Sequence, residues 1–289
     1  MASFSQWVAA ARLRTLPMAI APVVVGSAAA AELDSFHAGK ALLALIVALA
    51  LQIGVNYSND YSDGIRGTDD QRVGPFRLTG SGAAAPVTVR NMAFAFYGLA
   101  AVAGLALTVW SQAWWLMIIG VASIVAAWFY TGGKKPYGYL GLGEVFVFVF
   151  FGLVAVLGTT YTQAGEISGL AVTGAVGTGL VSTALLMANN VRDIPTDTEA
   201  GKKTLAVRLG DTKARWSYPI MLAVAIGVPL LYAQEHPWLW LMLILLVASV
   251  RPSLIMLEAE ERGELIPVLK MTGLFGILYA IVFTLGVVL

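Results

Sequence analysis

Long apolar runs alternate with short polar stretches along the whole chain. Several of these runs approach or exceed the roughly 18–20 residues that a helix needs to cross the hydrocarbon core of a bilayer. Their boundaries predict nine membrane-spanning helices, at about 15–32, 40–58, 90–110, 113–130, 143–162, 167–188, 215–233, 237–257 and 267–288. The pattern therefore predicts an all-α polytopic membrane protein whose two ends lie on opposite sides of the membrane.

The positions of the basic residues favour one orientation of these spans. Loops that stay in the cytoplasm carry an excess of Lys and Arg. With the N-terminus in the cytoplasm, all of the 18 Lys and Arg residues except Lys40 fall in inside segments. A wrong number of spans would scatter the basic residues over both sides, so this partition supports both the count and a cytoplasmic N-terminus.

The segment before the first span has an alternative interpretation. Trp7 is typical of a short interfacial helix. Arg12 and Arg14 before the apolar run 16–31 also resemble the start of a signal peptide. Pro17 and the many later spans favour a first membrane helix instead.

The amino-acid composition indicates a membrane protein and excludes several kinds of functional site. The chain is 58% hydrophobic and 12% charged, with a net charge of +1, whereas soluble domains carry about 25% charged residues. The mean hydropathy is +0.77. Cysteine is absent and histidine occurs only at His37 and His236, which excludes disulfides, thiolate nucleophiles, iron–sulfur clusters and histidine-rich metal sites. We expect no nucleic-acid partner.

A polar stretch follows the second span. Asn56, Asp60 and Asp63 are spaced i, i+4 and i+7, so on a helix they fall within a stripe of roughly 60°. Carboxylates this close to hydrocarbon are costly and indicate a functional site. Their oxygen-only ligands favour a hard cation such as Mg²⁺.

A similar set follows the sixth span on the same predicted side. Asn189, Asp193 and Asp197 are spaced i, i+4 and i+8, and Pro195 should end or kink the helix before Asp197. Two facing carboxylate pairs can hold one or two Mg²⁺ ions, which in turn can bind a diphosphate. The alternative is helix-end capping by solvated Asp and Asn, and the match between the two sets favours the functional interpretation.

Basic residues surround both acidic sets. They can stabilise a diphosphate as a leaving group, and they are Arg66, Arg72, Arg77, Arg192, Lys202 and Lys203. The alternative is a topology signal only. We assign to that role Lys213, Arg215, Arg251 and Arg262.

The third inside segment runs from 130 to 139. Its glycines allow the backbone to approach a ligand closely, and Tyr130 and Lys134 can face one pocket. The alternative is an interfacial aromatic belt with a turn. The glycines at 138–143 do not form a dinucleotide-binding fingerprint, and no strand precedes them.

Together these motifs resemble the UbiA superfamily of membrane prenyltransferases. Its pattern of an Asn-Asp-Asp set, a Tyr-xxx-Lys element and an Asp-xxx-Asp set is matched here by Asn56/Asp60/Asp63, Tyr130/Lys134 and Asp193/Asp197. Longer stretches resemble the 1,4-dihydroxy-2-naphthoate polyprenyltransferase branch, namely 14–17, 59–64, 72–75, 130–143 and 189–205.

The resemblance implies one prenyltransferase domain over 1–289, with nine helices around a central chamber. It implies Mg²⁺-dependent transfer from a polyprenyl diphosphate to 1,4-dihydroxy-2-naphthoate, with loss of CO₂, in the cytoplasmic membrane of a bacterium. The active site would face the cytoplasm and the prenyl tail would reach membrane lipid. The implied catalytic residues are Asp60, Asp63, Asp193, Asp197 and Lys134, and the four aspartates are the implied metal ligands. The implied substrate-binding residues are Asn56, Arg66, Arg72, Tyr130, Asn189, Arg192 and Lys202.

Three other functions remain open at this point. A relative of the same superfamily could use 4-hydroxybenzoate as the acceptor. A CDP-alcohol phosphatidyltransferase also uses membrane aspartates, but most of its motif is missing after Gly64. An ion-coupled transporter would place polar sites near the middle of the membrane, whereas the polar residues here gather at one face.

Overall fold

The computed structural model describes residues 2–66 and 76–289, and over these ranges its regular structure is helical. The α-helices are α1 (Phe4–Ala10), α2 (Pro17–Glu32), α3 (Ala38–Arg66), α4 (Pro86–Ser111), α5 (Leu116–Phe129), α6 (Gly143–Val147), α7 (Gly158–Ala164), α8 (Gly169–Arg192), α9 (Ile194–Glu199), α10 (Leu205–Leu209), α11 (Asp211–Gly227), α12 (Ile244–Glu258) and α13 (Ile266–Val288). Short 3-10 helices are η1 (Leu13–Thr15), η2 (Tyr137–Leu140), η4 (Val228–Tyr232), η5 (Pro237–Leu243) and η6 (Arg262–Leu265), and η3 (Phe148–Leu157) is a π-helix between α6 and α7.

Every apolar run that the hydropathy pattern marked is helical. Among the described residues, seven helical segments are long and apolar enough to cross a membrane, and the pair 4–15 and 17–32, bent by 50°, would make an eighth. The remaining run, α5, has 14 residues, which span about 21 Å at 1.5 Å per residue. That is short of a hydrocarbon core of about 30 Å. The all-helical membrane architecture is therefore confirmed, and the count of nine spans stays a prediction.

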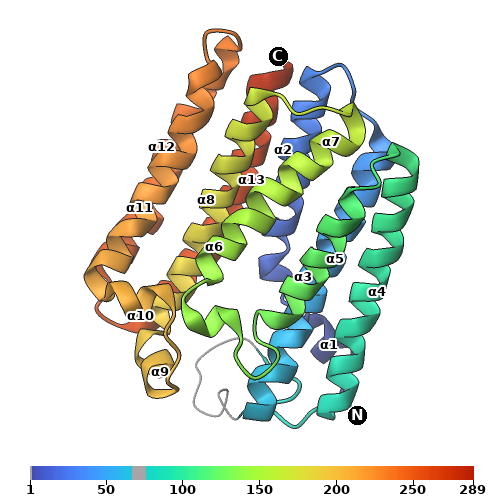
Figure 1. The fold of residues 1–289 in the computed structure, drawn as a ribbon. Coiled ribbons are helices and arrows are strands. Elements are labelled where there is room, and N and C mark those ends of the chain that lie inside the picture. The colour runs from blue at the N-terminus through green and yellow to red at the C-terminus, as the bar shows by residue number, and fades with distance from the viewer. Residues whose placement is uncertain (1, 67–75) are drawn as a thin grey trace.

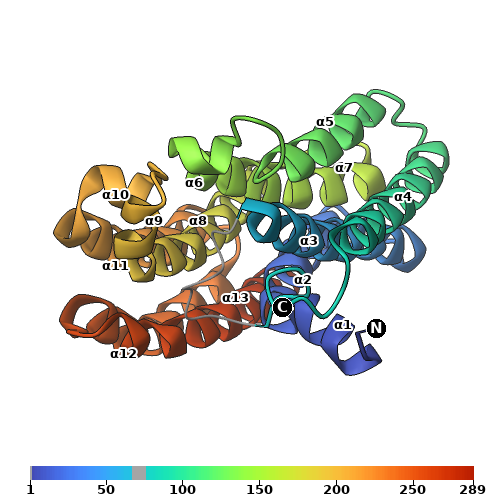
Figure 2. The same cartoon turned by 90° about the horizontal axis from the view of Figure 1, so that it is seen from below.

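The helices stand side by side, and the two chain ends lie at opposite ends of the bundle (Figure 1). The end that holds the N-terminus also carries α9, α10 and the last turns of α3. Figure 2, seen from that end, shows α9 and α10 at one side of the molecule and α1 at the other. We call this end the polar end, because both acidic sets lie there.

Helix α8 forms the inner wall of the bundle. It packs against η3, α11, α13 and α2, and 72% of its apolar window is buried, compared with 22% for α3. Small residues permit this packing. A Cβ on Gly152 of η3 would lie 2.6 Å from the Cα of Gly179 in α8. The acidic set at the end of α8 is thus held by a rigid, enclosed helix.

Helix α3, which carries the first acidic set, is fixed against α4. A Cβ on Gly54 would lie 2.5 Å from the ring of Tyr97, so glycine lets this ring lie directly on the helix. The Tyr97 hydroxyl also shares a hydrogen bond of 2.7 Å with Ser58. Both contacts lie within two turns of the acidic residues and hold the end of α3 in place.

Candidate active site

A cavity of about 1080 Å³ lies between the helices. Toward the polar end, its polar wall is formed by Asn56, Asn59, Asp63, Arg77, Tyr130, Tyr139, Asn189, Asn190, Arg192, Asp193, Asp197 and Lys202. The wall farther from this end is largely apolar and includes Val47, Leu51, Leu107, Leu116, Phe150 and Val154. A charged mouth that leads to an apolar interior suits a ligand with an ionic head and a long hydrocarbon tail.

Helix α3 continues to Arg66, so the first acidic set is helical as expected. Its members nevertheless have different surroundings. Asn56 and Asp63 line the cavity, whereas Asp60 does not. The Asp60 carboxylate accepts the backbone N–H of Leu78 at 2.7 Å and of Thr79 at 2.8 Å, and the residue is 1% exposed.

The structure gives Asp60 a different set of contacts from those of Asp63. Because both of its oxygens are used by backbone donors, Asp60 anchors the turn that follows the undescribed segment. That turn carries Arg77, whose Nη2 lies 3.5 Å from Asp63 Oδ2. Asp60 thus acts on the cavity through the turn that it holds, and a direct bond from Asp60 to a metal stays a prediction.

The second acidic set lies where α8 ends. Asp193 is the C-cap of α8, and its carboxylate accepts from Arg192 Nε at 2.7 Å and Nη2 at 2.8 Å. Arg192 also donates to Asn189 Oδ1 at 2.8 Å. Pro195 lies in the first turn of α9, a new short helix that contains Asp197. The expected break is confirmed, although Asp197 lies within this second helix rather than beyond all helix.

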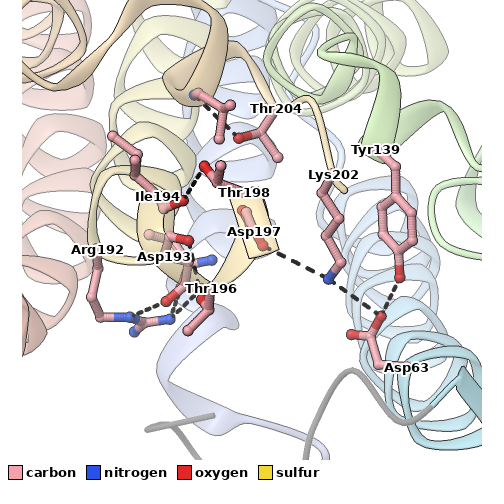
Figure 3. Close-up of polar contacts among 12 residues, drawn as sticks. Asp63, Tyr139, Arg192, Asp193, Ile194, Thr196, Asp197, Thr198, Lys202 and Thr204 are labelled. Atoms are coloured by element: carbon pink, nitrogen blue, oxygen red, sulfur yellow. Dashed lines mark hydrogen bonds and ion pairs between the residues drawn. The ribbon is translucent and has the colours of Figure 1, made fainter. Parts of the chain in front are cut away.

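Lys202 joins the two acidic sets (Figure 3). Its Nζ lies 3.9 Å from Asp63 Oδ1 and 3.8 Å from Asp197 Oδ1, and its side chain is 12% exposed. A cation shared by two mostly buried carboxylates is a strong electrostatic contact. The structure therefore brings the sets together through a lysine.

The donors present fit a hard cation. Within residues 2–66 and 76–289, no three His, Cys, Asp or Glu side chains form one metal-binding group. The cavity wall nevertheless carries three carboxylates, those of Asp63, Asp193 and Asp197. Each of them lies within 4 Å of an arginine or lysine side chain. Oxygen-only donors with excess negative charge are the ligands that Mg²⁺ prefers.

Asn56 lines the cavity and also forms hydrogen bonds that stabilise the bend between α1 and α2. Its Nδ2 donates to Ala11 O at 2.8 Å and to Thr15 Oγ1 at 3.0 Å, and Gln52 Nε2 donates to the same hydroxyl at 2.9 Å. These bonds hold the bend between α1 and α2, where Arg12 adopts φ of 53°. Substrate binding by Asn56 stays a prediction.

The 130–142 segment lies at the cavity, and the structure places its residues differently with respect to the cavity wall. Tyr130 lines the cavity, whereas Lys134 is exposed and outside the lining. Tyr139 lines the cavity and donates to Asp63 Oδ1 at 2.5 Å. Burial, and then the nearby Asp63 charge, raise the pKa of Tyr139 above its ordinary value, so its hydroxyl stays protonated and remains a donor.

The expected basic residues divide into three groups. Arg77, Arg192 and Lys202 line the cavity. Arg66 and Lys203 do not; the Arg66 guanidinium donates to the carbonyls of Thr131 and Gly133 and so fixes the 130–142 segment to α3. Arg72 lies outside the described residues.

Two residues that we assigned to topology alone have further contacts. Arg215 is buried, and it donates to Met256 O and to Asp211 at 2.8 Å. Arg262 donates to the same carboxylate and, at 3.1 Å, to Val191 O beside the second acidic set. These contacts fasten the end of α8 to α11 and η6. Contacts of this kind cannot be deduced from a count of charged residues.

Residues 19–287 match the UbiA prenyltransferase family, so the chain belongs to this family. It is 53% identical to the 1,4-dihydroxy-2-naphthoate octaprenyltransferase of Mycobacterium tuberculosis over 97% of this chain and 96% of that protein. It is 36% identical to the Escherichia coli protein of the same name over 98% and 95%.

Solved structures show the same fold at low sequence identity. A UbiA homologue from Aeropyrum pernix matches 96% of this chain and 98% of its own, with a TM-score of 0.72 and 14% identity. A UbiA homologue from Archaeoglobus fulgidus bound to DMAPP and Mg²⁺ matches 98% and 99%, with a TM-score of 0.65 and 13% identity.

Proposed function

We propose that this UbiA-family chain transfers a polyprenyl group from polyprenyl diphosphate to 1,4-dihydroxy-2-naphthoate, with Mg²⁺ as cofactor, in menaquinone biosynthesis. The similarity to proteins named for this acceptor over nearly the whole length supports the activity. The observation in the structure that carries the proposal is the charged mouth of the cavity above its apolar interior. A diphosphate head and an isoprenoid tail have the same division of polarity.

The acidic and basic residues of the cavity would bind different parts of the magnesium diphosphate. Asp63, Asp193 and Asp197 would hold Mg²⁺, which when bound neutralises and polarises the diphosphate. Arg77, Arg192 and Lys202 would pair with the remaining diphosphate oxygens, because each already lies against one of these carboxylates. The apolar wall would enclose the prenyl tail, keep water from the reacting carbon and let the tail reach lipid.

The reaction then proceeds by substitution. The allylic C1–O bond breaks, and the diphosphate leaves with the electron pair into the cationic mouth of the cavity. The ring carbon that bears the carboxylate attacks C1 and forms the new C–C bond. Loss of CO₂ returns its electron pair to the ring, which becomes aromatic again and gives demethylmenaquinol. The two ring hydroxyls supply the nucleophilicity, so the protein needs only to orient the ring beside C1.

The membrane arrangement is part of the same proposal. We place nine spans, a cytoplasmic N-terminus and one domain over 1–289 in the bacterial cytoplasmic membrane. The active site then faces the cytoplasm, where both ionic substrates are dissolved or exposed. The positions of the basic residues support this orientation.

Purified protein tests the proposal with three acceptors in parallel, 1,4-dihydroxy-2-naphthoate, 4-hydroxybenzoate and homogentisate, and one labelled prenyl diphosphate. We expect transfer to the naphthoate with one CO₂ released per product, loss of transfer with EDTA and recovery with Mg²⁺. Transfer to 4-hydroxybenzoate without CO₂ would replace the proposed acceptor. Uptake of substrate into sealed vesicles without any transfer would replace the enzyme by a transporter.

A further inference from the structure

Tyr139 lies where three parts of the polar end meet (Figure 3). Its hydroxyl donates to Asp63 on α3, and its carbonyl accepts the N–H of Lys203 at 2.9 Å from the segment after α9. Its ring lies under Lys202, with Nζ 4.5 Å from the ring centre, and Arg66 Cζ lies 5.5 Å from the same centre. One side chain therefore contacts both the first acidic set and the lysine that bridges to the second.

The direction of this side chain is set by its own backbone. Gly141 at φ 76° turns the chain after η2. Within η2, Gly138, the residue before Tyr139, donates its backbone N–H to Tyr130 O at 3.1 Å. Arg208 donates to Leu140 O at 2.8 Å from α10. These contacts fix the backbone on both sides of Tyr139, and they favour the orientation in which its hydroxyl points at Asp63.

We propose that Tyr139 is a positioning residue for the transfer reaction. Its hydroxyl orients the Asp63 carboxylate, and its ring fixes the Lys202 ammonium by a cation–π contact, so that Asp63 and Asp197 face one ligand at a set separation. Hydrogen bonds to a ligating carboxylate are known to tune metal binding, and their loss costs about 10–100-fold in affinity or activity. The inference rests on the proposed use of Asp63 as a metal ligand.

The test compares two phenols of the same short helix. Tyr139→Phe removes only the hydroxyl that contacts Asp63. Tyr137→Phe removes a hydroxyl that donates to Ala126 O at 2.9 Å, away from the aspartates, and it reports any general loosening of η2. We expect Tyr139→Phe to raise the Mg²⁺ concentration for half-maximal transfer by about tenfold or more, while Tyr137→Phe leaves that concentration unchanged.

A second measurement does not need turnover. Binding of Mn²⁺ in the presence of a non-reactive prenyl thiodiphosphate is followed by the loss of the free Mn²⁺ signal in electron paramagnetic resonance. Tyr139→Phe should weaken this binding by a similar factor. In an Asp63→Asn background the same change should have no further effect, because the hydroxyl acts through that carboxylate.

Three outcomes would overturn the inference: equal shifts for Tyr137→Phe and Tyr139→Phe, an unchanged Mn²⁺ affinity in Tyr139→Phe, or additive effects of Tyr139→Phe and Asp63→Asn. Failure of the proposed function looks different. In that case the unaltered protein transfers no prenyl group to 1,4-dihydroxy-2-naphthoate, whereas the dependence of Mn²⁺ binding on Tyr139 is still measurable.

Discussion

Asp60→Asn separates two roles for a residue that belongs to the most prominent motif of the chain. Hydropathy and helical spacing predict a metal ligand at this position. In the structure, its two carboxylate oxygens accept the N–H groups of Leu78 and Thr79. Asparagine keeps the size of the side chain and one oxygen, but it turns an NH₂ group toward one of these two backbone donors.

The size of the effect follows from the bonds that are lost. Hydrogen bonds to a charged group contribute about 1.5–3 kcal/mol, and a buried N–H left without an acceptor costs about 1–3 kcal/mol. These terms overlap, because they describe the same N–H, so we expect the turn at 77–79 to lose about 3 kcal/mol of local stability. That loss corresponds to a roughly hundredfold increase in local opening.

Hydrogen exchange measured by mass spectrometry on peptides that cover 76–82 reads this opening directly. We expect the amides of Leu78 and Thr79 to lose about two orders of magnitude of protection in Asp60→Asn. Asp63→Asn is the comparison variant, one turn along the same helix. It removes the contact to the Arg77 side chain but neither backbone hydrogen bond of the turn, so it should change the exchange of Leu78 and Thr79 much less than Asp60→Asn does, and it should raise the Mg²⁺ requirement. Unchanged protection in Asp60→Asn, together with a raised Mg²⁺ requirement, would refute the anchoring role and support Asp60 as a metal ligand.

Three further predictions test other parts of the structure. Because the chain has no cysteine, a single cysteine placed at Gln234 should react with an impermeant maleimide from outside intact cells, and one at Thr198 should not; the reverse pattern would invert the proposed topology. Lys202→Met should lower kcat/KM for the prenyl diphosphate by about tenfold or more, since it removes a cation shared by two carboxylates. Lys134→Met should change it by less than about twofold, and equal losses would contradict the placement of Lys134 outside the cavity. Thr15→Val should lower the Tm in detergent by about 2–6 °C, because the hydroxyl accepts from two buried amides, and Thr15→Ser should restore it; a Tm equal to wild type would show that these bonds do not hold the bend.

The membrane helices could be predicted from sequence because lipid leaves the backbone few choices. A chain segment in hydrocarbon must satisfy its own N–H and C=O groups, so each long apolar run becomes a helix. The same rule does not say how regular that helix is. The predicted span at 143–162 is interrupted by ten π-helical residues, Phe148–Leu157, and no pattern of apolar residues distinguishes these from α-helix. Likewise, the apolar run at 113–130 does not show that its helix, α5, covers only 14 residues, because the positions of the turns on either side are not visible in the hydropathy.

The acidic sets could be located from their spacing, but the partner of each side chain could not. A helical wheel places Asp60 near Asn56, and this is true of α3; it does not show that the turn at 77–79 folds back over that side of the helix. The position of Lys134 outside the cavity lining could not be predicted for a related reason. Loop spacing does not set a direction, and the positive φ angles of Gly133 and Gly141 turn Tyr139, rather than Lys134, into the cavity.

The charge arrangement also explains how a membrane protein can keep carboxylates buried before substrate arrives. Bare ions in a low-dielectric interior cost several kcal/mol each, and Asp63, Asp193 and Asp197 are buried. The chain offsets this cost with its own cations, Arg77, Arg192 and Lys202, each within 4 Å of a carboxylate. In the proposed reaction a magnesium diphosphate brings both signs of charge, so its cation can pair with the aspartates while its oxygens pair with the released Arg and Lys. Every buried charge then exchanges one opposite partner for another, and binding does not require any of them to be left bare.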